Sequence, residues 1–95
     1  MGHYIKAKIP MVTFKEGSKV IAWSPALDLS TYGDTEKLAK ERFGEAVSIF
    51  IDELVEMGTL EDVLEECGWQ LSQDKQNWLP PVFKLHDEEL VRIPV

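Results

Sequence analysis

The fold of this chain is decided by the stretch Trp23-Ser24-Pro25-Ala26-Leu27-Asp28-Leu29-Ser30-Thr31-Tyr32-Gly33-Asp34-Thr35, which leads directly into a long amphipathic segment. Residues 20–23 are apolar on both faces, as in a central strand, and Pro25 ends that strand because proline has no N–H to donate. Residues 28–32 alternate and predict a short further strand. Asp34 or Thr35 can then accept hydrogen bonds from the free N–H groups of a first helical turn. The stretch therefore predicts a joint between an antiparallel sheet and a helix.

Upstream of this joint, apolar and polar residues alternate from residue 5 to residue 9, which is the period of a half-exposed strand. Pro10 interrupts the pattern, so we expect an edge strand, or a bulge at Pro10 after which the strand resumes through Val12 and Phe14. Residues 16–18 supply a hairpin turn. Together these features predict a three-strand antiparallel meander over residues 4–32.

Downstream of the joint, apolar residues recur at spacings of three and four and predict a long helix over residues 34–57. The stripe expected to face the sheet consists of Ala39, Phe43, Ala46, Val47, Phe50, Leu54 and Met57. A second apolar seam, made by Leu38, Ile49 and Ile51, suggests a subunit contact or cover by the C-terminal segment. Gly58 is expected to end the helix as a left-handed cap.

The remaining third of the chain predicts a short second helix and a β-rich tail. The short helix covers residues 59–67, with Thr59 as its N-cap. Strands are expected to begin at Trp69, to lie around Phe83 and Leu85, and to run over residues 91–95. The expected fold class is thus a single α+β domain over residues 1–95, in which one long helix packs on an antiparallel sheet and residues 69–95 form the tail.

Negative charge is concentrated in the helical middle of the chain. Of the net charge of −7 over 95 residues, residues 34–67 carry 11 acidic and 3 basic side chains, a balance of −8. This balance disfavours direct binding to nucleic acid, because a phosphate backbone requires Lys and Arg. An acidic surface can instead steer a basic protein partner. The other interpretation is that these charges merely solvate an exposed helix face.

The sequence favours a cytoplasmic location. Cys67 is the single cysteine, so no internal disulfide can form, and the chain carries neither an export-signal pattern nor an apolar run long enough for a membrane span. We therefore expect no membrane partner.

Candidate catalytic and metal-binding groups are few. His3, His86 and Cys67 lack the spacing of a metal site, and Cys67, beside two glutamates, is better explained as a small buried hydrophobe than as a nucleophile. A sheet followed by a helix can be a reduced RNase H-like unit, but the first strand has no acidic residue, and Asp28 with Asp34 could hold at most a weak ion. We expect no enzyme, cofactor or metal.

The aromatic residues leave two interpretations open. The chain has a large number of tryptophans for its length, namely Trp23, Trp69 and Trp78. Tryptophan is enriched in the binding hot spots of protein interfaces. They could equally fill the core and cover the sheet. A stacking platform for single-stranded RNA would need neighbouring Lys and Arg, and Lys19 near Trp23 is the one hint of that kind.

The amino-acid sequence of the joint resembles that of HicB-type antitoxins and their solitary HicB-like relatives. The matching residues, in order, are Pro25, Leu27, Thr31, Gly33-Asp34-Thr35 and Ala39, followed by Gly58-Thr59-Leu60-Glu61, Gly68-Trp69 and Trp78-Leu79-Pro80-Pro81. The chain departs from the family where Asp28-Leu29 replaces the usual Gly-Cys. No helix-turn-helix pattern follows Gly68, so operator binding is not carried over.

The resemblance implies a protein that inhibits by masking: it would cover a small basic RNA-cleaving toxin of the HicA type. The interface residues that we infer for such a partner are Trp23, Asp28, Tyr32, Asp34, Glu36, Glu41 and Glu45. The alternative is a solitary HicB-like protein with a structural or regulatory role and no toxin. We also expect a homodimer, because the broad apolar surface of the long helix and the edge strand near Pro10 leave area to cover.

Overall fold

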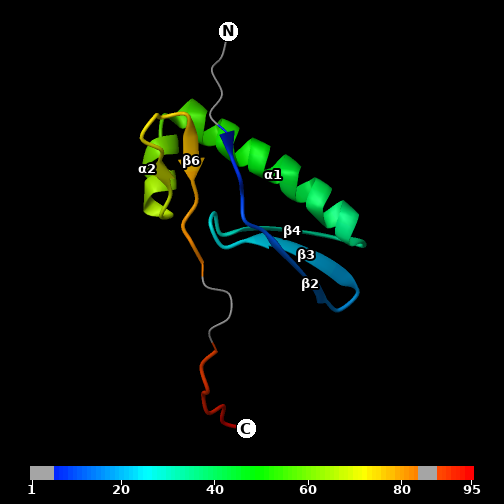
Figure 1. Cartoon of the computed structure of the whole chain (residues 1–95). Helices are drawn as coiled ribbons and strands as arrows, with labels where there is room; N and C mark the ends of the chain where they lie inside the picture. The colour runs from blue at the N-terminus through cyan, green and yellow to red at the C-terminus, as the bar shows by residue number, and fades with distance from the viewer. Residues whose placement is uncertain (1–5, 84–87) are drawn as a thin grey trace.

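The computed structural model describes residues 6–83 and 88–95 and confirms the α+β class. These residues form two three-stranded sheets and two helices (Figure 1). In chain order the elements are β1 (Lys6–Ala7), β2 (Val12–Glu16), β3 (Lys19–Ser24), β4 (Leu29–Gly33), α1 (Glu36–Met57), α2 (Leu60–Glu66), β5 (Gln70–Leu71) and β6 (Asn77–Leu79). Both helices lie on the same side of the β2–β4 sheet, and neither described helix is long and apolar enough to cross a bilayer.

The meander is antiparallel, with β3 between β2 and β4, and it begins later than we predicted. Residues 6–14 do not form one bulged strand. Pro10 lies between two separate strands, of which β2 is an edge of the meander and β1 pairs in parallel with β6 in the other sheet. The physical reason is the missing N–H of Pro10, which ends pairing there and lets the chain leave one sheet for the other. Tyr4 and Ile5 lie outside the described residues.

The joint forms as the sequence indicates, and α1 is capped at both ends. Thr35 is the N-cap, and its Oγ1 accepts a hydrogen bond of 3.1 Å from the N–H of Leu38. Gly58 takes the left-handed conformation, with φ of 72°, and its N–H bonds back to carbonyls of the last turn. Gly33 is buried where the chain turns into the helix, and a Cβ there would stand 2.8 Å from the backbone N of Ala39. The close approach of sheet and helix therefore requires glycine at this position.

Replacement of Gly33 with alanine is expected to lower the free energy of unfolding by about 1–3 kcal/mol, because the added methyl overlaps backbone that cannot move aside easily. The matched control is Gly44→Ala on α1, where an added Cβ meets nothing within 4 Å. That change should raise stability by about 0.5–1 kcal/mol, since alanine is the better helix former. Urea denaturation followed by circular dichroism measures both. Equal stability of the two variants would contradict the close contact.

The buried side of α1 follows the predicted stripe except at its end. Ala39, Phe43 and Leu54 are buried, but Met57 is 70% exposed. Met57 is the last residue of α1, and at this end the helix has passed the edge of the β2–β4 sheet that Met57 was expected to face (Figure 1). Ile49 of the second seam is also exposed, as is Val55.

The short helix α2 begins where predicted, yet Thr59 does not cap it with its side chain. Instead the backbone carbonyl of Thr59 accepts a 3.0 Å hydrogen bond from the N–H of Val63. Cys67 follows the helix, half-buried beside the core.

The tail is less regular than predicted. β5 and β6 form a hairpin around the turn 72–76, in which the carboxylate of Asp74 accepts from the Ser72 hydroxyl and the Gln76 N–H. Those hydrogen bonds, that of Ser72 first, lower the pKa of Asp74. The predicted strands at Phe83 and over residues 91–95 are absent from the described residues, because a strand needs a paired neighbour and no described strand pairs with them. Leu85 and His86 lie outside the described residues.

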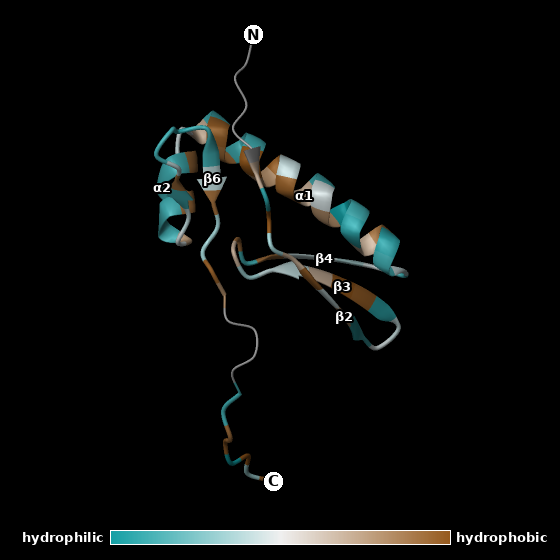
Figure 2. Cartoon of the chain, in the orientation of Figure 1, coloured by the Kyte–Doolittle hydropathy of each residue, from teal (hydrophilic) through white to brown (hydrophobic). Residues whose placement is uncertain are grey.

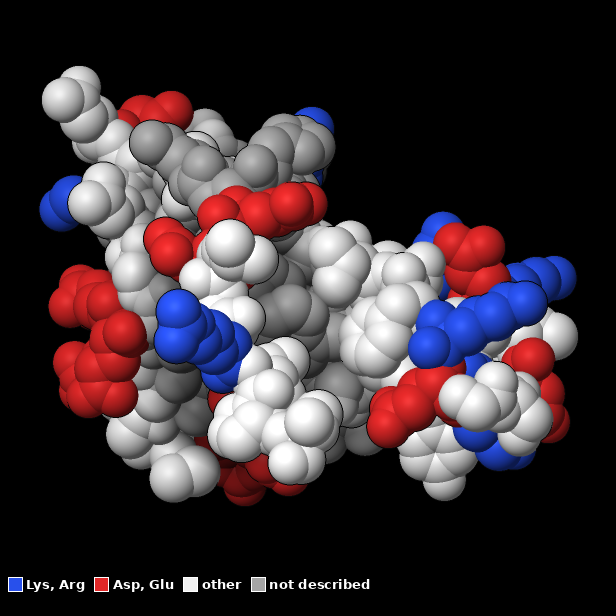
Figure 3. All heavy atoms as spheres, turned by 90° about the horizontal axis from the view of Figure 1, so that it is seen from below, with Lys and Arg blue, Asp and Glu red and all other residues white. Residues whose placement is uncertain are grey.

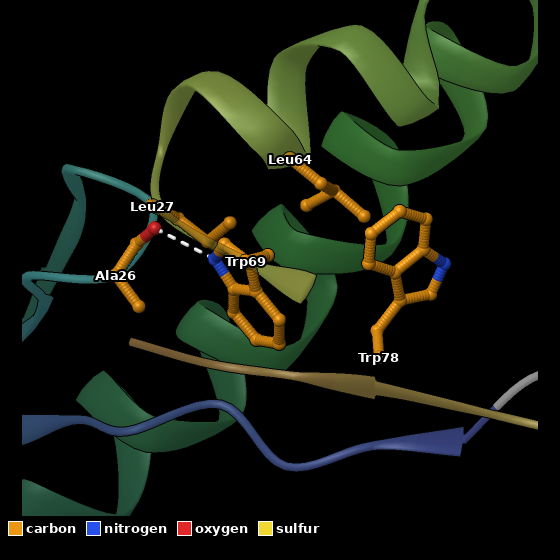
Figure 4. Packing of buried hydrophobic residues seen from close by; sticks show 5 residues of the cluster. All are labelled: Ala26, Leu27, Leu64, Trp69 and Trp78. Atoms are coloured by element: carbon orange, nitrogen blue, oxygen red, sulfur yellow. Dashed lines mark hydrogen bonds between the residues drawn. The ribbon is translucent and has the colours of Figure 1, made fainter. Parts of the chain in front are cut away.

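The main core ties the joint to the tail (Figure 4). Its buried members come from the loop between β3 and β4, from α2 and from the β5–β6 hairpin: Ala26, Leu27, Leu64, Trp69 and Trp78. Trp69 is 2% exposed, and its indole N–H donates a 2.9 Å hydrogen bond to the carbonyl of Ala26. A second cluster, Ala22, Ala39 and Phe43, lies between the β2–β4 sheet and α1. Trp69 and Trp78 are thus core residues, whereas Trp23 is half-buried.

Candidate functional site

The outward side of α1 carries a line of acidic side chains, which we call the acidic stripe: Glu41, Glu45, Asp52 and Glu56. Steps of four, seven and four residues keep these positions on one side of a helix with 3.6 residues per turn. All of them are exposed, opposite the buried Ala39, Phe43 and Leu54. The stripe therefore presents a row of carboxylates to solvent along most of α1.

The acidic stripe is locally unfavourable for the helix that carries it. Glu41 and Glu45, like Asp52 and Glu56, are like charges four residues apart, and such pairs destabilise a helix by about 0.2–0.5 kcal/mol each. Among the described residues none of the four forms an ion pair, and the last turn of α1 has no basic residue to balance the helix dipole. A positively charged partner would relieve this repulsion.

The carboxylates at the start of α1 are arranged differently, because the chain's own lysines pair with them. Lys19 donates to Asp34, and this hydrogen bond and charge lower the pKa of Asp34. Lys40 bonds to Glu36 at 3.2 Å, and the hydroxyl of Thr13 donates to the same carboxylate, which lowers the pKa of Glu36. These two carboxylates fix the joint between the sheet and the helix rather than extending the acidic stripe.

The face of the β2–β4 sheet that α1 leaves uncovered is apolar in its middle. The register aligns Phe14 with Ile21 and Tyr32 across the sheet, and Val12 with Trp23. Phe14 and Tyr32 are 48% and 57% exposed. We call these five residues the open sheet face. Seen from this side, the surface over β2–β4 carries charges of both signs, whereas the end of the molecule with α2 is mostly acidic (Figure 3).

Polar contacts hold the aromatic rings of the open sheet face. The indole N–H of Trp23 lies 3.5 Å from Oδ1 of Asp28, a residue with a positive φ of 51° in the loop before β4. Arg42 donates a 2.9 Å hydrogen bond to the carbonyl of Tyr32, and its guanidinium lies 5.7 Å from the centre of the Tyr32 ring. Lys19 and Arg42 are therefore engaged at this edge, and the charge around the rings is mixed rather than basic.

The seven residues inferred from the sequence thus fall into three groups. Trp23, Asp28 and Tyr32 belong to the open sheet face or its rim, on the side away from α1. Asp34 and Glu36 form the ion-paired joint, and Glu41 and Glu45 are half of the acidic stripe. Asp52 and Glu56 were missed, although their spacing from Glu45, seven and eleven residues along the same helix, is a signal that the sequence carries.

Among the described residues, no group of three or more His, Cys, Asp or Glu side chains lies close enough together to hold a metal ion. Asp28 precedes β4 and Asp34 follows it, and a strand rises about 3.3 Å per residue, so their Cα atoms lie more than about 15 Å apart. Two carboxylates at that separation cannot share one ion. His3 and His86 lie outside the described residues.

A comparison of the chain with family models, with curated proteins and with solved structures finds no match. The arrangement of residues described above is therefore the basis for the functional argument.

Proposed function

We propose that this chain is a HicB-like antitoxin, or a binding module derived from one, that neutralises a small basic RNA-cleaving toxin of the HicA type by covering it. The observation that carries the proposal is the acidic stripe on α1. Its carboxylates are exposed, unpaired among the described residues and mutually repulsive, which is the arrangement that a basic partner surface complements.

A protein that itself binds RNA presents the kind of basic surface that the acidic stripe complements. An RNA-cleaving protein needs Lys and Arg to hold the phosphate backbone. A rigid row of carboxylates along a helix can occupy such a surface and exclude the RNA. The same field increases the rate of encounter between the two proteins at low salt. The order of sheet, joint and helix is in keeping with the family resemblance, and it supplies the rigid support on which the row stands.

The test is to isolate the tagged chain from its native source together with the product of the adjacent gene. We expect a 1:1 complex with a small basic protein, and we expect that protein alone to cleave RNA. One equivalent of this chain should reduce the cleavage to background, whereas an unrelated protein of similar size and negative charge should leave it unchanged.

Recovery of the chain without a basic partner, with no RNA-cleaving product from the adjacent gene, would contradict this proposal and favour a solitary HicB-like protein. Inhibition by the unrelated acidic protein as well would show that charge alone is responsible, and it would equally remove the case for a specific antitoxin.

A further inference from the structure

The hydrogen bonding of the β2–β3 hairpin determines which backbone groups of β2 point outward. Its turn consists of residues 17–18, and the glycine at the first position has a positive φ of 61°. In such a two-residue hairpin the flanking residues, Glu16 and Lys19, form the closing hydrogen-bonded pair. Hydrogen-bonded and non-hydrogen-bonded pairs then alternate along the ladder. The N–H and C=O groups of Thr13 and Lys15 therefore point away from β3, to the outer edge of the sheet.

The two outer edges of the β2–β4 sheet differ. At the β4 edge the carbonyl of Tyr32 accepts a 2.9 Å hydrogen bond from Arg42 of α1, and that helix lies nearer to β4 than to β2 (Figure 1). At the β2 edge, β3 is the one described strand that pairs with β2. No backbone hydrogen bond among the described residues engages the outward groups of Thr13 or Lys15. The sheet is therefore covered along β4 and open along β2.

The residues of β2 allow a further strand to pair at this edge. β2 contains neither a proline nor a bulge, which are devices that block many edge strands. Phe14, on the open sheet face, is 48% exposed. Figure 2 shows β2 changing from hydrophobic to hydrophilic towards the hairpin turn, where Lys15 and Glu16 lie. Antiparallel pairing of two copies of β2 would therefore place the charged end of each strand beside the apolar end of the other.

We propose that β2 of one copy pairs antiparallel with β2 of a second copy, about a two-fold axis at Phe14, so that the two meanders form one continuous sheet. In this register Thr13 of one copy and Lys15 of the other exchange both N–H···O hydrogen bonds. Phe14 faces Phe14 of the second copy in a non-hydrogen-bonded pair, with their Cβ atoms about 4.5–5.5 Å apart. The open sheet faces of the two copies become one apolar surface.

Charge complementarity supports this register. In one copy the hydroxyl of Thr13 donates to Oε1 of Glu36 at 3.2 Å, and Lys40 bonds to the same oxygen. Oε2 of Glu36 has no side-chain partner among the described residues, and the side chain is 60% exposed. Lys15, which forms no ion pair within the described part of the chain, lies on the same side of the sheet as Thr13. Across the axis, Lys15 of the second copy stands opposite Thr13 and pairs with Oε2 of Glu36.

The neighbouring registers that also align the outward backbone groups are less favourable. With the axis at Lys15, two like charges would lie directly opposite each other. With the axis at Thr13, Lys15 would lie opposite Met11, which precedes β2, so the pairing would extend beyond the strand. In the proposed register Glu16, the other charged residue of β2, lies on the opposite face from Lys15 and across from Val12. No like charges then meet across the axis, and the whole of β2 is paired.

The proposed dimer leaves the acidic stripe accessible. Residues that lie opposite each other in an antiparallel pair share one face of the sheet, so both copies of α1 lie on the same side of the joined sheet. Each α1 packs over β3 and β4, away from the axis at β2. The inference concerns self-association and is independent of the proposed toxin partner.

Light scattering on the full chain tests the association. We expect a mass of about twice 10.8 kDa for the wild type and 10.8 kDa for Lys15→Pro, which removes an outward N–H but no hydrogen bond to β3. The matched control is Ser30→Pro, which makes the same change at the outer edge of β4 and should stay dimeric. Circular dichroism verifies that both variants are folded. A monomeric wild type, or a dimer that survives Lys15→Pro, would overturn the proposal.

Cysteine pairing tests the register and does not rely on the proline variants. In a Cys67→Ser background, a chain with Val12→Cys and a differently tagged chain with Glu16→Cys are mixed and oxidised. We expect a disulfide between the two kinds of chain, because these positions lie opposite each other with Cα atoms about 4.5 Å apart. Each variant alone is the control and should give none, since its two cysteines lie four positions, or about 13 Å, apart along the strands. Equal linkage in the controls, or none in the mixture, would refute the pairing.

Discussion

Replacement of Trp69 with alanine should remove about 3–5 kcal/mol from the free energy of unfolding, which is the range for deletion of a large buried aromatic side chain. Trp69 is 2% exposed and packs with Leu27, Leu64 and Trp78. Its loss would leave a cavity where three parts of the chain meet. The total free energy of unfolding of a domain of this size is only about 5–15 kcal/mol. Much of the variant protein should therefore be unfolded near physiological temperature.

The hydrogen bond of Trp69 can be separated from its packing. Trp69→Phe keeps most of the ring but removes the indole N–H, so the buried carbonyl of Ala26 loses its 2.9 Å donor. This change should cost about 1–3 kcal/mol, less than alanine does. Urea denaturation followed by circular dichroism gives both values.

Val82→Ala is the matched control for these two variants, because Val82 is 95% exposed just beyond the hairpin. A surface change of this kind should stay within about 0.5 kcal/mol of wild type. If Trp69→Ala behaved like Val82→Ala, the joint and the tail would not share a core.

The elements that sequence patterns predict well here are those with a local physical cause. The proline that ends β3, the Thr35 cap and the left-handed Gly58 each act within a few residues, so their signals are contiguous in the sequence. The repeating pattern of apolar residues in β3, β4 and α1 extends over enough positions to identify which side of each element faces the core. For this reason the fold class follows from residues 12–58 alone.

The features that sequence reasoning misses depend on distant contacts. The pairing of β1 with β6 joins segments about 70 positions apart, and no local signal marks it. The alternation over residues 91–95 is real, but a strand requires a paired neighbour, and none of the strands that the structure describes pairs with these residues. Met57 continues a correct helical period beyond the end of the sheet that it was expected to cover.

In the candidate interface, too, some features can be predicted from the sequence and others depend on distant contacts. The sequence identifies Glu41 and Glu45 through the charge of residues 34–67, because charge is a property of composition. It cannot show that Lys19 and Lys40 pair with Asp34 and Glu36, since these contacts need the folded joint. Nor can it show that Trp23 and Tyr32 lie on the side opposite the acidic stripe, which follows from the strand register.

Reversal of the charge on the acidic stripe should have the largest effect on partner binding. In the triple variant Glu41→Lys, Glu45→Lys and Glu56→Lys, each position exchanges an attraction for a repulsion. At about 0.7 kcal/mol per exposed position, the three together should weaken binding to a basic partner by about 30-fold. Asp52 is kept, because it also lines a mainly apolar cavity with Val55 and Leu60.

The matched control reverses three exposed acids of α2, Glu61, Glu65 and Glu66, which changes the net charge by the same amount. Circular dichroism would verify that both variants are folded. Because these three acids lie on α2 and not on the acidic stripe of α1, the control should retain affinity within a few-fold of the wild type.

The most direct measurement is the dissociation constant, by titration calorimetry, between this chain and the basic product of the adjacent gene, for the wild type and both triple variants. We predict tight 1:1 binding for the wild type. The dissociation constant should rise by about 30-fold in the α1 variant and stay close to the wild-type value in the α2 variant. Absence of binding by the wild type, or equal losses in the two variants, would contradict the assignment of the acidic stripe as the surface that covers a toxin.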